Sequence, residues 1–337
     1  MSARRTGIPD TSPKPGRLRL RRLLRRVAIG AVVTLVLVTA CCLVYNRLTD
    51  RRATAPAGLT YLQAGDVLTR VRRWGDTGSP VVLVHGFAES ADTWAPAAEL
   101  LAARHRVYAL DLDGWGYSRR VAPFDLDHQT RQLLAVLNIL ALRDPLLVGH
   151  SSGAAIVAEA ALRAPAAVGG VMFLDGDALA TGAGQRSPWE HLVLPPYRTT
   201  ALRLALRSDA LIRNIYSGRC GPRCPALDAA GLDQWRRPFQ MRGAEAGLWS
   251  MLADGVPGLS EQRLAGLETL AMPKSVVFGA RDDVFDPATA QQTAARIGAP
   301  PPTLLAGSYH LTMISDPAGV AAAVERLATR VPQRAGP

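Results

Sequence analysis

Short apolar runs alternate with stretches of helical spacing along most of this chain. Several of these runs are rich in Val and Leu without polar interruption. Continuous apolar strands are typical of a parallel sheet that is buried on both faces, so the pattern predicts an α/β fold. The predicted strands are 80–86, 106–114, 145–149, 168–175, 274–279 and 302–307, and the predicted helices are 93–103, 127–142, 152–163, 287–297 and 316–329.

The alternation stops between residues 178 and 268. This segment contains no clear buried strand, but it holds Pro195-Pro196, Arg-rich helical stretches and three of the six Trp residues. The sheet pattern then resumes. We therefore predict a helical lid, 178–268, inserted into an α/β core formed by 59–177 and 269–330, with a C-terminal tail at 331–337.

A second apolar feature precedes the core. Residues 27–45 are 19 residues without a charge, close to the length that spans a bilayer as a helix. The basic tail 1–26 predicts that the N-terminus stays in the cytoplasm and that the core lies outside the cell membrane, after a linker at 46–58. A cleaved signal peptide, a lipoprotein signal ending at Cys41 and a twin-arginine signal around Arg21-Arg22 are the alternatives.

The net charge of the chain, +11, is concentrated in the N-terminal tail. Residues 1–26 carry nine Arg or Lys and one Asp, a net of +8, which leaves +3 for everything else. No basic stripe remains on the core, so we expect no nucleic-acid partner.

The cysteines divide into two pairs. Cys41 and Cys42 fall in the apolar span, whereas Cys220 and Cys224 flank Gly-Pro-Arg. On a domain outside the cell the second pair would favour a disulfide, and two free thiols are the other possibility. A zinc site needs more ligands than this neighbourhood offers, so no metal or cofactor is expected.

The segment with the clearest chemistry is Gly149-His150-Ser151-Ser152-Gly153. It fits G-x-S-x-G between a predicted strand and a predicted helix. In that context the serine lies on a sharp turn at the edge of the sheet, with the N-terminus of the next helix beside it. The pattern makes Ser151 a candidate nucleophile, whereas an ordinary Gly-rich turn is the plainer interpretation.

Four segments together make the chain similar to the α/β-hydrolase superfamily over residues 59–330. They are His85-Gly86-Phe87, Asp111–Ser118 (DLDGWGYS), the G-x-S-x-G turn, and the pair formed by Gly279–Asp283 (GARDD) and Ser308–Pro317 (SYHLTMISDP). The resemblance implies a mostly parallel sheet with helices on both faces and a Ser-Asp-His triad in that chain order.

The resemblance assigns the acid and the base of this triad. His310 follows the last predicted strand, at the edge where Ser151 lies, and is the expected base. Asp282 lies three residues after Gly279, where the family places its acid. Four other carboxylates remain as alternatives for the acid: Asp175, Asp177, Asp283 and Asp286.

The remaining assignments concern the oxyanion hole and the substrate pocket. The resemblance places the oxyanion donors at the backbone N–H groups of Phe87 and Ser152. Aromatic side chains that could line a pocket are Trp115 in the core and Trp189, Trp235 and Trp249 in the lid, and burial of the lid against the core is the competing explanation for the lid residues.

A serine nucleophile favours acyl transfer. We therefore expect a serine hydrolase that cleaves an ester through an acyl-enzyme on Ser151, with a lipophilic small molecule as substrate. Amide, peptide or carbon–carbon bond hydrolysis and cofactor-free haloperoxidase-like activity use similar triads. A non-catalytic binding or receptor protein with the same fold is the alternative from another class.

Overall fold

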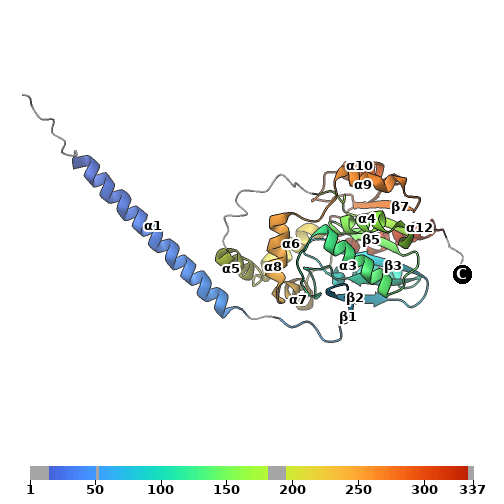
Figure 1. Cartoon of the computed structure of the whole chain (residues 1–337), viewed down its shortest axis with the longest axis horizontal. Coiled ribbons are helices and arrows are strands. Elements are labelled where there is room, and N and C mark those ends of the chain that lie inside the picture. Colours follow the sequence, from blue (N-terminus) through green and yellow to red (C-terminus); the bar gives the residue numbers. More distant parts are fainter. Residues whose placement is uncertain (1–14, 51–52, 181–194, 333–337) are drawn as a thin grey trace, which may run out of the picture. The chain divides into compact units, whose positions relative to one another are not determined.

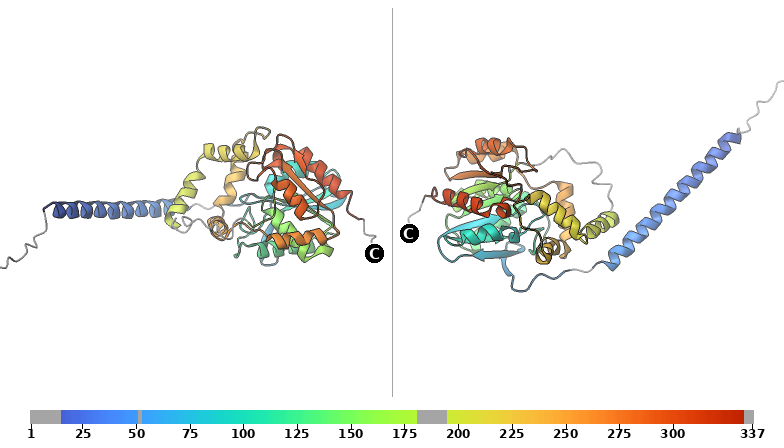
Figure 2. Two further views of the ribbon diagram at one scale, coloured as in Figure 1. Left: turned by 90° about the horizontal axis from the view of Figure 1, so that it is seen from above. Right: turned by 180° about the vertical axis from the view of Figure 1, so that it is seen from behind.

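The structure is a computed structural model that describes residues 15–50, 53–180 and 195–332. It contains two compact units, which are considered separately. One consists of 1–50 and 194–203, and the other consists of 51–193 and 204–337. Figures 1 and 2 show the ribbon of the whole chain.

The larger unit is built on one eight-stranded sheet in the order β1-β2-β4-β3-β5-β6-β7-β8. All neighbours from β4 onward are parallel, whereas β2 pairs antiparallel with β1 and with β4. The sequence pattern did not locate this edge hairpin. The strands are β1 Thr60–Ala64, β2 Val67–Trp74, β3 Ser79–Val84, β4 His105–Leu110, β5 Leu146–His150, β6 Gly170–Leu174, β7 Lys274–Gly279 and β8 Thr303–Leu305.

Helices cover both faces of this sheet, which confirms the predicted α/β class. Helices α3 and α4 pack against each other on one face, and α2 packs against α12 on the other (Figures 1 and 2). Because β5 and β6 lie between these layers, every residue of both strands is buried. The core helices are α2 Ala95–Leu101, α3 Leu126–Ile139, α4 Gly153–Arg163, α10 Thr289–Arg296, α11 Thr312–Ser315 and α12 Pro317–Ala328.

A group of helices follows β6 and precedes β7. No strand occurs in the described part of this insertion, although Leu179 and Leu259 form an isolated bridge near its two ends. Its helices are α5 Pro195–Ala205, α6 Asp209–Cys220, α7 Ala229–Arg236, α8 Ala244–Asp254 and α9 Glu261–Ala265. The cysteines at the end of α6 are joined as a disulfide, Cys220–Cys224.

The smaller unit contains α1, Pro15–Leu48, and α5 as far as Arg203. Residues 19–48 of α1 are long and apolar enough to cross a membrane, and α1 is therefore a candidate membrane anchor. Its large apolar side chains are about half exposed or more, as expected for a helix surrounded by lipid. The helix is longer than the apolar span because Arg and Leu on its N-terminal side are good helix formers.

Candidate active site

The turn after β5 holds Ser151 in a strained conformation at the carboxyl edge of the sheet. Ser151 has φ 50°, a region that non-glycine residues rarely occupy, and its N–H donates to the Leu174 carbonyl at 2.9 Å. Gly149 and Gly153 permit this turn. A Cβ on Gly149 would lie 2.4 Å from the Gly153 carbonyl oxygen, and one on Gly153 would lie 2.5 Å from the Val84 oxygen.

The structure brings Ser151, His310 and Asp282 together from three separate loops. His310 Nε2 lies 3.1 Å from Ser151 Oγ, and His310 Nδ1 donates to Asp282 Oδ2 at 2.9 Å. The loops follow β5, β7 and β8, which are parallel, so all three begin at one edge of the sheet. The side chains of His310 and Asp282 are 8% and 5% exposed, which protects their hydrogen bond from water.

The second oxygen of Asp282 is also fixed. Its Oδ1 accepts hydrogen bonds from the backbone of Val284 at 2.7 Å and Phe285 at 3.2 Å. The Phe285 ring lies 5.8 Å from that of His310. The carboxylate therefore has a defined orientation toward the imidazole, as the orienting acid of a triad requires.

The other candidate carboxylates have different partners. Asp175 is fully buried, accepts from the Gly279 N–H at 2.7 Å and is hydrogen-bonded to Thr312. Burial raises the pKa of Asp175 to about 8. Asp177 accepts from the Leu179 N–H, Asp283 pairs with Arg219 at 2.8 Å, and Asp286 accepts from the Ala288 N–H.

Two backbone donors lie beside Ser151. The N–H groups of Phe87 and Ser152 have no acceptor among the described residues. The loop of Phe87 approaches the serine closely, since a Cβ on Gly86 would lie 2.8 Å from Ser151 Cβ. A pair of unpaired N–H groups at this place has the chemistry of an oxyanion hole.

A buried ion pair lies beneath this arrangement, and sequence reasoning assigned it no function. His150 Nδ1 lies 2.9 Å from Glu89 Oε1, and both side chains are almost completely buried. The Glu89 carboxylate also accepts from the Gly86 N–H at 3.2 Å. Burial alone would lower the pKa of His150, but the Glu89 charge outweighs it and raises this pKa to about 9.

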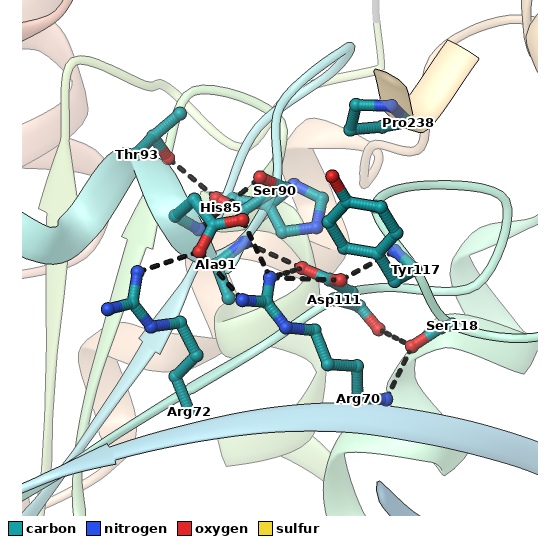
Figure 3. Close-up of polar contacts among 12 residues, drawn as sticks. Arg70, Arg72, His85, Ser90, Ala91, Thr93, Asp111, Tyr117, Ser118 and Pro238 are labelled. Atoms are coloured by element: carbon teal, nitrogen blue, oxygen red, sulfur yellow. Dashed lines mark hydrogen bonds and ion pairs between the residues drawn. The ribbon is translucent and has the colours of Figure 1, made fainter. Parts of the chain in front are cut away.

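A second buried network supports the loop that carries Phe87 (Figure 3). Asp111 accepts from the N–H groups of Ala91 and Tyr117, each at 2.7 Å, and lies 3.4 Å from the Arg70 guanidinium. Arg70 also forms two hydrogen bonds with Asp92, at 2.7 and 2.9 Å. Asp111 thus uses both carboxylate oxygens to hold the turn 111–118 and the segment after Phe87 in place.

Aromatic side chains connect the Phe87 loop to the insertion. Trp115 contacts Phe87 with ring centroids 4.8 Å apart and Phe239 at 6.2 Å. A small hollow of about 10 Å³ is lined by Trp115 and Phe239, and a neighbouring one of about 10 Å³ by Trp235 and Phe239. Glu89 borders both. Two of the predicted pocket residues thus line hollows in the described part of the chain.

Of the two remaining predicted pocket residues, the structure describes only Trp249. Trp249 is half-buried on α8 and is not among the residues lining these hollows, whereas its neighbour Met251 packs beside Gly114. Trp189 lies outside the described residues. Among the described residues, no three His, Cys, Asp or Glu side chains gather in a way that could hold a metal ion.

The end of α6 contacts the loop of His310. The Leu311 N–H donates to the Arg219 carbonyl at 3.2 Å, and a Cβ on Gly221 would lie 2.3 Å from the Tyr309 ring. Gly221 has φ 78°. The disulfide-closed turn after α6 therefore fits closely against the residues on either side of His310.

The eight-stranded fold and the Ser-His-Asp arrangement at its carboxyl edge together define a hydrolase-like α/β protein. The model of the alpha/beta hydrolase family matches residues 81–323, well over half of the chain. The chain belongs to the alpha/beta hydrolase family.

Its similarities to individual proteins are partial. The chain is 38% identical over 88 residues to a pimeloyl-[acyl-carrier protein] methyl ester esterase of Aliivibrio salmonicida and 40% identical over 88 residues to a non-heme haloperoxidase of Rhodococcus erythropolis. Each match covers 26% of this chain and 32% of the relative. The matched segments thus span about a third of the length of these relatives.

A solved structure extends the likeness over nearly the whole chain. The crystal structure of a membrane phospholipase A superposes with a TM-score of 0.64 and 22% identity, covering 93% of this chain and 99% of that one. Residues 53–337 are 285 of 337, about 85% of this chain, so the alignment extends into the N-terminal 52 residues.

Proposed function

We propose that this protein is a serine hydrolase that cleaves an ester through an acyl-enzyme on Ser151. The observation that carries the proposal is the continuous hydrogen-bonded line from Ser151 Oγ through His310 to Asp282. Such a line turns a weakly nucleophilic hydroxyl into a strong nucleophile because the imidazole takes its proton as the new bond forms.

The proposed reaction has two halves. Ser151 Oγ attacks the ester carbonyl carbon while its proton passes to His310 Nε2, and the carbonyl oxygen, now negative, receives hydrogen bonds from the Phe87 and Ser152 N–H groups. His310 then gives the proton to the departing alcohol, which leaves the acyl group on Ser151. A water molecule repeats the sequence, its proton going to His310 and then to Ser151 as the acid is released.

Asp282 has a supporting role in this scheme. By accepting from Nδ1 it keeps Nε2 free to take the serine proton, and its charge stabilises the imidazolium that forms. The relatives that act on a methyl ester support the ester as the bond cleaved. The aromatic side chains of Trp115, Trp235 and Phe239 support a lipophilic substrate.

We further propose that α1 anchors the enzyme in the cell membrane with the basic tail in the cytoplasm and the hydrolase outside. Nine Arg or Lys precede the apolar span, and such residues are retained on the cytoplasmic side. The disulfide Cys220–Cys224 supports an oxidising compartment for the larger unit. The membrane phospholipase A supports a place at the membrane.

A fluorophosphonate probe, which reacts with activated serines, tests the assignment. We expect the probe to label the full chain, Ser151→Ala to abolish labelling, and Ser152→Ala to retain it because Ser152 contributes only its backbone. A screen with esters of graded acyl length then tests the reaction itself. Labelling that survives in Ser151→Ala would refute Ser151 as the nucleophile. Labelling without turnover of any ester would favour a binding protein or another acyl-transfer reaction.

A further inference from the structure

Within the smaller unit, α5 is bound to α1 at the point where the apolar span ends. Asn46, the first polar residue after 27–45, donates from Nδ2 to the Pro196 carbonyl at 2.8 Å. Its Oδ1 accepts from Thr200 at 3.0 Å, and its backbone carbonyl accepts from Arg203 at 2.5 Å. Three residues of α5 thus converge on one residue of α1.

The contacts between α1 and α5 become more polar along α1, from the apolar span toward Asp50, as the surroundings do across a membrane surface. Toward the apolar side, the Tyr197 hydroxyl lies 2.5 Å from Thr39 Oγ1, which is seven residues, or about 10 Å, before Asn46 along the helix. Toward the polar side, Arg203 reaches Thr49 at 3.3 Å and Asp50 at 3.2 Å. Tyrosine is enriched at the boundary of lipid and water, where its ring is in apolar surroundings and its hydroxyl finds a partner.

The composition of α5 suits the same boundary. The helix carries two arginines and no Asp or Glu, and its Leu204 side chain is 53% exposed. Helices that lie on the surface of anionic bilayers typically combine arginine with leucine, and their arginines face the lipid headgroups. Because Asn46 directly follows the apolar span, α5 lies at the bilayer surface when α1 spans the bilayer.

We propose that α5 is a membrane-interface helix that is clasped to the anchor at Asn46 and binds the anionic lipid surface. Only three residues separate α5 from α6, and the end of α6 contacts the residues on either side of His310. Along the chain, α6 is therefore the only helix between α5 and the turn that contacts the His310 loop. Resting here on the proposed function, we infer that the substrates are acyl esters resident in the bilayer.

The membrane contact can be tested on the full chain in vesicles. In a Cys41→Ser/Cys42→Ser background, an environment-sensitive fluorophore is attached to Ala201→Cys, an exposed position of α5, or to Ala103→Cys, an exposed position of the core. Two kinds of vesicle with brominated acyl chains are compared, one of phosphatidylcholine alone and one that also contains phosphatidylglycerol. We expect the bromine atoms to quench the fluorophore at position 201, more strongly in the vesicles with phosphatidylglycerol, and not to quench it at position 103. Equal absence of quenching at both positions, with the protein still vesicle-bound, would overturn the proposal.

The clasp is tested by removing its centre. Asn46→Ala is compared with Thr34→Ala, a polar-to-apolar change within the same apolar span. The readout is the turnover of a vesicle-embedded long-chain ester divided by that of a soluble short-chain ester. Losing two side-chain hydrogen bonds should lower this ratio about tenfold in Asn46→Ala, whereas Thr34→Ala should match the parent.

The outcomes separate the two proposals. An unchanged ratio in Asn46→Ala, with quenching at position 201 retained, would refute the clasp. A protein that turns over neither ester while position 201 is quenched would instead refute the hydrolase, and the membrane contact of α5 would stand. Circular dichroism of each variant establishes that it is folded.

Discussion

His150, the residue directly before Ser151, donates from its Nε2 to the backbone carbonyl of His310 at 2.9 Å. Its other ring nitrogen is paired with Glu89, and the two imidazole rings lie 4.9 Å apart. A charged, fully buried side chain therefore links the turn of the proposed nucleophile to the loop of the proposed base. This relationship leads to the first two predictions.

Removing His150 alone should destabilise the protein more than neutralising both partners. His150→Leu leaves the Glu89 carboxylate buried without its counter-charge, which costs about 3–5 kcal/mol in the free energy of unfolding. In Glu89→Gln/His150→Leu the charge is gone, while the Gln carbonyl can still accept from the Gly86 N–H, so part of that loss is recovered. Denaturant unfolding of both variants measures the difference. A double variant less stable than His150→Leu would contradict the pairing.

Stability should fall as the pH is raised toward 9. The His150 pKa is raised from 6.5 to about 9, so its contribution is fully present below about 6.5 and is lost as the pH rises through about 9. Asp175 also makes stability fall as the pH rises. Burial raises its pKa from 3.8 to about 8, so the unfolded chain loses this proton at a lower pH than the folded chain does. The thermal midpoint of the detergent-solubilised protein, followed from pH 6 to 9, checks this, and Asp175→Asn should flatten the curve.

Asp282 and Asp175 should differ sharply in their effect on turnover. Asp282→Asn removes the charge that orients His310 and should lower kcat about 10³- to 10⁴-fold. Asp175→Asn replaces a carboxyl that is already held largely uncharged and should lower kcat less than about tenfold. Steady-state kinetics on one soluble ester distinguishes them. Comparable losses in the two variants would mean that Asp282 is not the only acid serving His310.

Gly221 and Gly218 form a matched pair at the end of α6. A Cβ on Gly221 would meet the Tyr309 ring at 2.3 Å from a backbone with φ 78°, whereas a Cβ on Gly218 has nothing within 4 Å. Gly221→Ala should therefore displace the His310 loop and lower kcat about tenfold or more. Gly218→Ala should keep kcat and raise stability by about 0.5–1 kcal/mol, as Ala does in a helix. Equal kinetics of the two variants would show that the α6 contact is irrelevant to the base.

The proposed topology predicts where protease acts. Protease added to intact cells should degrade residues 59–330 and spare the basic tail 1–26, detected with an N-terminal epitope tag. Opening the cells should expose the tail as well. Survival of the core in intact cells would reverse the orientation.

Several elements follow from local sequence because their signals are local. The strand, turn and helix over 145–163 were predicted from an apolar run, two glycines and a small-residue helical pattern, and β5 and α4 occupy those residues. Predicted helix 93–103 is instead a short 3-10 turn followed by α2, Ala95–Leu101, because Pro96 favours a helix start at that position. The edge strands β1 and β2 carry too many polar residues to stand out as buried runs.

The sequence by itself determined the α/β class and the apolar span, because hydrophobic periodicity encodes each element. The chain order of the candidate Ser, Asp and His followed from the resemblance of four short motifs to the family. Only the tertiary structure decided which carboxylate faces His310, that Glu89 pairs with a histidine 61 residues away, and that α5 meets α1 at Asn46. Those choices depend on side-chain packing between segments far apart in the chain, and no local pattern records which distant partner a buried charge or hydroxyl will meet.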